Sequence, residues 1–205
     1  MTKAKKWSYA VLALVLLIGA AGVWLWRSSS ATGLEGTAEE HEYDRLQRKQ
    51  QWEQIVAKSR QQAVQSLACQ KVVRLAQYRL GQVGREAVYE CLADSRQVLT
   101  SPTAALMMSD VYIQIGMANM AQRAAFESLT KGSDVSTNAR AFRRLVETAV
   151  ITRQYDLALK YIALLEESSA HRDWARSMRE VIKHPTPEYQ KLQKSYDEIK
   201  DQFFL

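Results

Sequence analysis

The fold is decided by a short turn sequence that recurs along the chain. The three copies are TRQYDLA at residues 152–158, IGMANMA at residues 115–121 and LGQVGREA at residues 80–87. Each copy joins the end of one apolar-periodic stretch to the start of the next, with an alanine one turn into the new helix. These alanines, Ala87, Ala121 and Ala158, lie 34 and 37 residues apart. A period near 34 residues, with a small residue where two antiparallel helices cross closely, is typical of tetratricopeptide-type repeats.

Outward from these turns, the composition is that of helices separated by short loops. Ala, Leu, Gln, Arg and Glu dominate from Glu39 onward, and strand signals are missing. Ser101 followed by Pro102 is typical of an N-cap and the first turn of a helix. A fainter copy of the unit begins at Gln51, where Trp52 takes the place that Tyr155 has later.

We therefore predict an all-α fold with four segments. Residues 28–38, SSSATGLEGTA, have the composition of a flexible tether. Residues 39–184 are expected to form a tetratricopeptide-like array of helical hairpins, an α-solenoid. Residues 185–205 are expected to supply a C-terminal capping helix over the last apolar face of that array.

The first segment, residues 1–27, is predicted to anchor the chain in a membrane. Residues 8–26 are apolar over 19 positions, which is about 28 Å of helix and enough to span a bilayer. Lys3, Lys5 and Lys6 precede the span and only Arg27 follows it closely, so the positive-inside rule keeps the N-terminus cytoplasmic. The expected localisation is a single-pass inner-membrane protein whose helical domain is periplasmic. The alternative is a cleaved signal peptide, with a weak small-residue site at residues 29–31.

The net charge of +6 does not indicate a nucleic-acid-binding protein. Four of the 28 basic residues flank the predicted span, which leaves 24 against 22 acidic residues in the rest of the chain. Nucleic-acid binding requires a basic excess on the folded domain. Nucleic acid is therefore not expected as a partner.

The densest basic region of the domain holds the candidate partner-binding residues. Arg140, Arg143 and Arg144 share one face of a predicted helix. They could receive an acidic peptide or an anionic glycan on the concave side of the array. The alternative is an ordinary solvated face whose charge nearby acids such as Glu147 balance.

Cys69 and Cys91 are a possible disulfide pair, because the predicted topology places them in an oxidising compartment. They lie on two helices joined near Gln82, with an offset of four residues, or about 6 Å along the helix axis. That offset is marginal for a bond that needs Cα atoms within about 7 Å. The alternative is two buried, small apolar side chains.

Metal and catalytic motifs are missing from the sequence. His41, His171 and His184 have no spacing that would place two ligands on one helix face. There is no Gly-x-Ser-x-Gly motif and no phosphate-binding glycine loop. The sequence thus offers no catalytic, metal or cofactor site, and an enzyme is not expected.

Several segments together resemble the C-terminal part of an uncharacterised family of Bacteroidetes membrane proteins, a domain of unknown function. The segments are the Trp52 helix, Tyr78–Gly84, Ala121–Glu127 (AQRAAFE), Arg144-Leu145, Tyr155–Glu166 (YDLALKYIALLE) and Trp174-Ala175. The resemblance covers roughly residues 45–180. It implies helical repeats on a membrane protein, without an activity. Members of that family carry many membrane helices before this region, whereas one is predicted here, which favours a stand-alone anchored module over a transporter.

The function expected from these features is a membrane-anchored helical-repeat scaffold that mediates protein–protein interaction in the cell envelope. The partner would be a protein or a peptide, and the sequence leaves the oligomeric state open. Two alternatives remain. One is an obligate structural subunit of a membrane complex. The other is an envelope enzyme or carbohydrate-handling factor that uses the arginine face.

Overall fold

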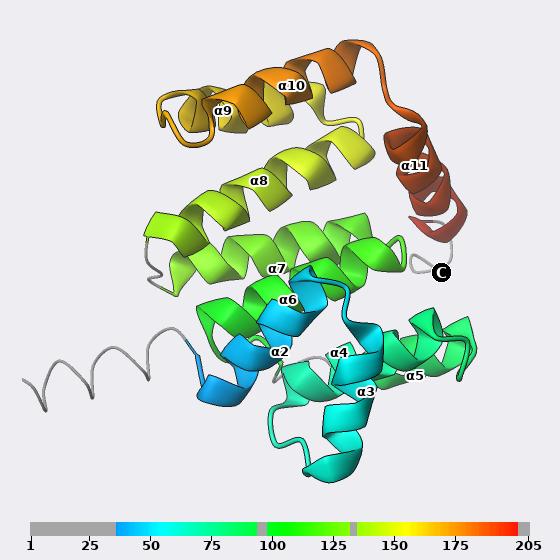
Figure 1. The fold of residues 1–205 in the computed structure, drawn as a ribbon. Coiled ribbons are helices and arrows are strands. Elements are labelled where there is room, and N and C mark those ends of the chain that lie inside the picture. Colours follow the sequence, from blue (N-terminus) through cyan, green and yellow to red (C-terminus); the bar gives the residue numbers. More distant parts are fainter. Residues whose placement is uncertain (1–35, 94–97, 132–134, 201–205) are drawn as a thin grey trace, which may run out of the picture. The chain divides into compact units, whose positions relative to one another are not determined.

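The computed structural model describes residues 36–93, 98–131 and 135–200 of the chain. It has two compact units, Met1–Leu34 and Glu35–Leu205, of which the first lies outside the described residues. The second unit contains ten helices in the described ranges and no strand there (Figure 1). The helices are α2 (Ala38–Arg48), α3 (Trp52–Gln61), α4 (Leu67–Arg79), α5 (Arg85–Ala93), α6 (Pro102–Gln114), α7 (Ala118–Thr130), α8 (Val135–Ile151), α9 (Tyr155–Glu166), α10 (Arg172–Lys183) and α11 (Pro187–Lys200).

The helices from α6 to α10 form a stack in which each helix packs on the one before it in the chain (Figure 1). α2 contacts α3, α4 and α6, and α4 also packs on α6. α6 is buried along nearly its whole length, and its start follows the local signals in the sequence. The Ser101 hydroxyl accepts a hydrogen bond from the Ala104 N–H at 3.0 Å, with Pro102 in the first turn.

One turn geometry ends four of the helices. A residue with positive φ follows the helix in each case: Gln50 (53°), Gly81 (69°), Gly116 (89°) and Arg153 (62°). The next N–H then donates to the carbonyl five residues back, at 2.8–3.0 Å in all four turns. This is the hydrogen bond of the Schellman motif, which terminates a helix and turns the chain sharply.

Three of these turns continue directly into the next helix, and the same helical position is buried after each of them. Ile55, Ala121 and Ala158 occupy it, and all three are fully buried. The faint unit beginning at Gln51 therefore has the same geometry as the two later turns. Ala87 does not belong to this set, because the turn after Gly81 is longer and leaves Ala87 half-buried.

The predicted fold class is wrong in one respect, the transmembrane helix. Among the residues that the structure describes, no helix is long and apolar enough to cross a membrane. α8 is the longest of them, at 17 residues, and carries three arginines; α6 is apolar, but its 13 residues extend only about 20 Å. The predicted span at residues 8–26 and residues 201–205 of the predicted cap lie outside the described residues. The predicted localisation depends on that span and stays a prediction.

The C-terminal helix α11 differs from the predicted cap. It runs across the turns at one end of the stack, whereas the last helix in the stack is α10 (Figure 1). The Gln193 side chain donates to the Val150 carbonyl at 3.0 Å, and Ile199 packs so closely on Gly116 that a Cβ there would lie 2.6 Å from Ile199 Cδ1. Tyr189 contacts both apolar clusters of the core. α11 therefore joins the two halves of the stack.

Candidate functional site

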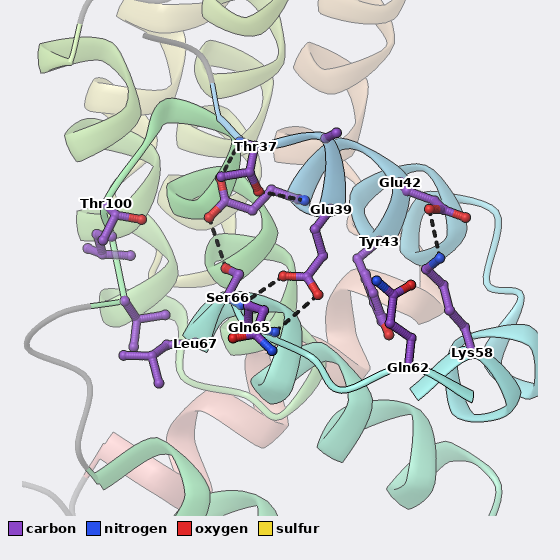
Figure 2. Close-up of a pocket in the computed structure, with 14 residues that line it drawn as sticks. Thr37, Glu39, Glu42, Tyr43, Lys58, Gln62, Gln65, Ser66, Leu67 and Thr100 are labelled. Carbon is purple, nitrogen blue, oxygen red and sulfur yellow. Dashed lines mark hydrogen bonds and ion pairs between the residues drawn. The ribbon is translucent and has the colours of Figure 1, made fainter. Parts of the chain in front are cut away.

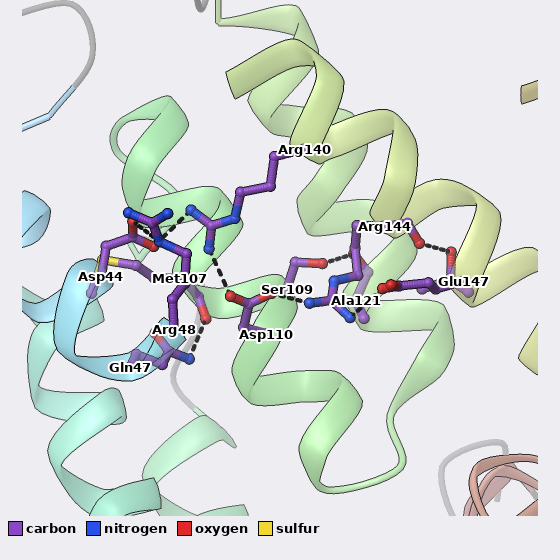
Figure 3. A network of polar contacts seen from close by, with 11 residues as sticks. Asp44, Gln47, Arg48, Met107, Ser109, Asp110, Ala121, Arg140, Arg144 and Glu147 are labelled. Carbon is purple, nitrogen blue, oxygen red and sulfur yellow. Dashed lines mark hydrogen bonds and ion pairs between the residues drawn. The ribbon is translucent and has the colours of Figure 1, made fainter. Parts of the chain in front are cut away.

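An ion-pair network joins α2, α6 and α8 (Figure 3). At its centre is Asp110, a lone acid in the apolar helix α6. Arg140 Nη2 lies 2.6 Å from Asp110 Oδ2, and Arg144 Nη2 contacts the other carboxylate oxygen. The two arginines are four residues apart on α8, so they share one face and both reach the same acid.

The network continues on both sides of Asp110. Arg140 Nη1 lies 2.7 Å from Asp44 of α2, and Arg48 Nε reaches the same carboxylate at 3.0 Å. On the other side, Arg144 Nη1 pairs with Glu147 at 2.7 Å. Each of these carboxylates thus has at least one guanidinium partner, and one arginine links all three helices.

Burial and charge act in opposite directions on the central acid. Asp110 is only 7% exposed, and burial alone would raise the pKa of its carboxyl group. The guanidinium groups of Arg144 and Arg140 outweigh burial, so the pKa lies below its ordinary value. In the same way, burial would lower the pKa of each arginine, but the acids raise it. The central groups are therefore ionised at neutral pH.

The network forms one wall of a cavity of about 590 Å³, which we name the arginine cleft. Its lining comes from α2, α6, α8 and the residue before α10. The lining residues are His41, Asp44, Arg48, Thr103, Leu106, Asp110, Thr137, Arg140, Arg143, Arg144, Glu147 and His171. Arg143 is not part of the ion-pair network; its guanidinium carbon lies 4.4 Å from the centre of the Trp174 ring.

The structure thus places the three predicted arginines in the lining of one cavity, but their contacts differ. Arg140 and Arg144 hold helices together through acids of the chain itself. Arg143 makes no ion pair with a carboxylate in the described ranges. Whether any of the three contacts a partner stays a prediction.

A second and larger cavity, of about 930 Å³, lies beside the N-terminal ends of α2 and α4 (Figure 2). We name it the α2–α4 groove. Its lining is Thr37, Ala38, Glu39, Glu40, Glu42, Tyr43, Lys58, Gln62, Gln65, Ser66, Leu67, Val98, Leu99 and Thr100. Leu67 is 40% exposed although it is a large apolar side chain. This groove has no counterpart among the predicted sites.

Two acidic residues of the groove hold its walls in place (Figure 2). Glu39 accepts from the Gln65 and Ser66 N–H groups at 3.1 and 2.8 Å, just before α4 begins. Glu40 is 3% exposed and accepts from the Ser66 hydroxyl at 2.9 Å, the Ser101 hydroxyl at 2.8 Å and the Thr37 N–H at 3.1 Å. One carboxylate therefore ties together the starts of α2, α4 and α6.

The two cysteines are free thiols in the structure, without the disulfide that was one of the two sequence-based alternatives. Cys69 on α4 is fully buried, and Cys91 on α5 is half-buried. Burial raises the pKa of the Cys69 thiol to about 12 and outweighs the Ser66 hydrogen bond, which acts to lower it. A thiol with that pKa is not a nucleophile at neutral pH.

Comparison with known proteins assigns a family but not an activity. A sequence family, described as "Family of unknown function (DUF6057)", matches residues 1–205. The chain belongs to this family. No curated protein and no solved structure matches the chain. The function of this DUF6057 chain must therefore be inferred from its own residues.

The need of Asp110 for a cationic partner could have been found in this DUF6057 sequence, although not which residue supplies it. An acid in the stretch PTAALMMSDVYIQ needs a cation once that helix is buried. Nothing local predicts the arginine cleft itself, since His41 and His171 lie 130 residues apart in the sequence. In the described part of the chain, no group of His, Cys, Asp and Glu side chains could hold a metal ion.

Proposed function

We propose that this chain is a helical scaffold that binds a segment of a partner protein in the α2–α4 groove. The observation that carries the proposal is the groove itself, a cavity of about 930 Å³ beside an exposed leucine. Its volume lies in the range of ligand-binding pockets. Stacked helices present extended surfaces of this kind to peptides.

The lining of the groove favours a segment with apolar and basic side chains. Leu67 and Leu99 offer apolar surface, while Tyr43 and Val98 line the groove but are each only 1% exposed. Burial raises the pKa of the Tyr43 phenol to about 12, so this ring stays neutral. A set of three carboxylates faces a single ammonium group, that of Lys58. Lys58 is 2.9 Å from Glu42, and Glu40 is only 3% exposed, which leaves the half-buried Glu39 as the acid that can meet a basic partner.

We propose binding rather than catalysis. A general acid or base needs a pKa near the working pH. Asp110 is a buried acid at the centre of the network, and its pKa is displaced away from neutrality. Both of its oxygens already contact arginines. These properties support a structural role for the network.

The relation to tetratricopeptide-type repeats and to a Bacteroidetes family is also a proposal. Its support is the recurring turn at Gln50, Gly116 and Arg153, with a buried residue four positions after each N-cap. We propose on this basis a relation to tetratricopeptide-type repeats of the Bacteroidetes family named above.

The test is site-specific crosslinking in cells that make the chain naturally. The photoreactive residue p-benzoylphenylalanine is placed at Leu67 in the full chain. The matched control positions are Phe126 on α7 and Leu164 on α9, which are 53% and 51% exposed. We expect one discrete adduct from position 67, with the crosslink mapping to a partner segment that carries apolar and basic residues.

A second variant makes the crosslinking result specific to the groove. Leu99→Asp adds a charge to the apolar lining, and we expect it to abolish the adduct from position 67. Circular dichroism checks that the variant is folded. The proposal is wrong if positions 67, 126 and 164 give the same adducts, if position 67 gives none, or if folded Leu99→Asp crosslinks as before.

A further inference from the structure

We propose that the arginine cleft binds a ligand carboxylate, held by Arg143 together with His41 and His171. This inference is independent of the α2–α4 groove, because the two cavities share no lining residue. It assigns the cleft to a ligand with a single negative charge. The carboxylate can come from a small organic acid or from an acidic side chain of a protein, and the test separates these two sources.

The charges in the cleft do not balance. Four arginines line it: Arg48, Arg140, Arg143 and Arg144. Three carboxylates face them, those of Asp44, Asp110 and Glu147. Counting the arginines and carboxylates alone, one positive charge remains. One carboxylate neutralises that excess, whereas a phosphate dianion would exceed it.

The remaining charge belongs to Arg143. The other three guanidinium groups all contact carboxylates of the network. Arg143 instead lies over Trp174, with 4.4 Å between the guanidinium carbon and the ring centre. Such stacking uses the face of the guanidinium and leaves its in-plane N–H donors for an acceptor such as a carboxylate.

The surroundings of Arg143 fit a ligand better than an open surface. The cavity of about 590 Å³ has room for a molecule of amino-acid size. His41 enters it from α2 and His171 from the residue that precedes α10. An imidazole has at least one N–H donor in either protonation state. The network around Asp110 fixes one wall of the cavity, so little ordering is needed when a ligand binds.

The test is an NMR titration of the full chain with a mimic of peptide-bound glutamate, N-acetyl-glutamate N-methylamide. The glutamine analogue has the same shape without the charge. We expect the glutamate mimic to shift the ring signals of His41 and His171. The signals of His184, which lies outside the cleft at the end of α10, should stay in place. The glutamine analogue should shift none of the three.

Variants locate the binding group. Arg143→Gln should weaken binding by about tenfold, the loss expected for a charge-assisted hydrogen bond. Arg176→Gln removes an exposed arginine from α10 and should leave the dissociation constant within about twofold. Thermal unfolding checks that both variants are folded.

A parallel titration with acetate separates the two sources of the carboxylate. Equal affinity for acetate and for the glutamate mimic assigns the cleft to small acids, and preference for the mimic assigns it to protein side chains. The proposal is overturned if His184 shifts as much as the other two histidines. It is also overturned if the glutamine analogue binds equally well, if folded Arg143→Gln binds like the unchanged chain, or if neither carboxylate probe shifts His41 and His171.

Discussion

Arg153 and Asp197 form a two-point ion pair between the α8–α9 turn and α11, with Nη1–Oδ1 at 2.9 Å and Nη2–Oδ2 at 2.7 Å. The same arginine has a φ of 62°, a conformation that favours glycine. One residue therefore combines backbone strain with a contact that holds the C-terminal helix. The two effects oppose each other in the free energy of unfolding.

A double-mutant cycle should separate these two effects. Asp197→Asn removes the charge that pairs with Arg153 and should cost about 0.5–1 kcal/mol, as expected for an exposed pair with good geometry. Arg153→Gly in that variant should then stabilise the chain by about 1 kcal/mol, because it relieves the left-handed strain. Urea unfolding measures both changes. Destabilisation by Arg153→Gly in the Asp197→Asn background would contradict this account.

The buried acid Asp110 should be the most sensitive polar residue of the described helices. Asp110→Asn keeps the shape of the side chain but leaves two arginines without their shared charge. We expect a loss of about 3–5 kcal/mol in the free energy of unfolding. Glu147→Gln, in a more exposed pair on α8, is the matched control and should cost less than about 1 kcal/mol. Equal losses in the two variants would show that Asp110 has no central role.

The lowered pKa of Asp110 predicts that the stability lost in Asp110→Asn depends on pH. The pKa of Asp110 in the folded chain lies below its ordinary value of 3.8. Its contribution to stability is therefore fully present above that ordinary value and is lost as the pH falls through the lower, folded pKa. The stability difference between the unchanged chain and Asp110→Asn should be constant between about pH 5 and 8 and shrink below about pH 4. Chemical unfolding at several pH values measures it, and a difference that disappears above pH 5 would rule out the lowered pKa.

The close contact of α6 and α7 should not accept a larger side chain. Ala121 is fully buried, and its carbonyl accepts a hydrogen bond from the Ser109 hydroxyl at 2.7 Å. Ala121→Leu should therefore destabilise the chain by about 3 kcal/mol. Ala87→Leu changes a half-buried alanine outside the set of equivalent positions and should cost less than about 1 kcal/mol. Thermal unfolding compares them; similar losses would mean that the two alanines are equivalent after all.

The two thiols should react at different rates. Cys91 is half-buried, whereas Cys69 is fully buried and has a pKa raised to about 12. A thiol reagent such as dithionitrobenzoate should modify Cys91 first in the folded chain and both cysteines in denaturant. Cys91→Ser should remove the faster phase. If no thiol reacts in denaturant without a reductant, the purified chain contains the disulfide.

The helices and their turns could be predicted because their signals are local. Ser101 and Pro102 start α6 through contacts within one turn, and Gly116 ends it through its own backbone freedom. Gln50 and Arg153 show the limit of this approach, since non-glycine residues adopt the same left-handed turn. In the sequence, the turns at these two residues could be recognised only from their spacing along the chain.

The sites were harder to predict because their residues are distant in the sequence. Periodicity placed three arginines on one face of α8, but it could not show that Asp44 and Asp110 neutralise two of them. The position of α11 was missed for a related reason. Its contacts with Gly116 and with the Val150 carbonyl lie at the C-terminal ends of α6 and α8, and Tyr189 packs on both apolar clusters, so no single helix face in the sequence indicated where α11 lies.

The hydrogen bonds of Glu40 also set an order for folding during synthesis. Its hydroxyl partners, Ser66 and Ser101, follow it by 26 and 61 residues. A ribosome therefore completes α2 well before the groups that fix it have been made. The first helix of the described fold docks only after α4 and α6 have emerged, and until then the carboxylate of Glu40 remains in water.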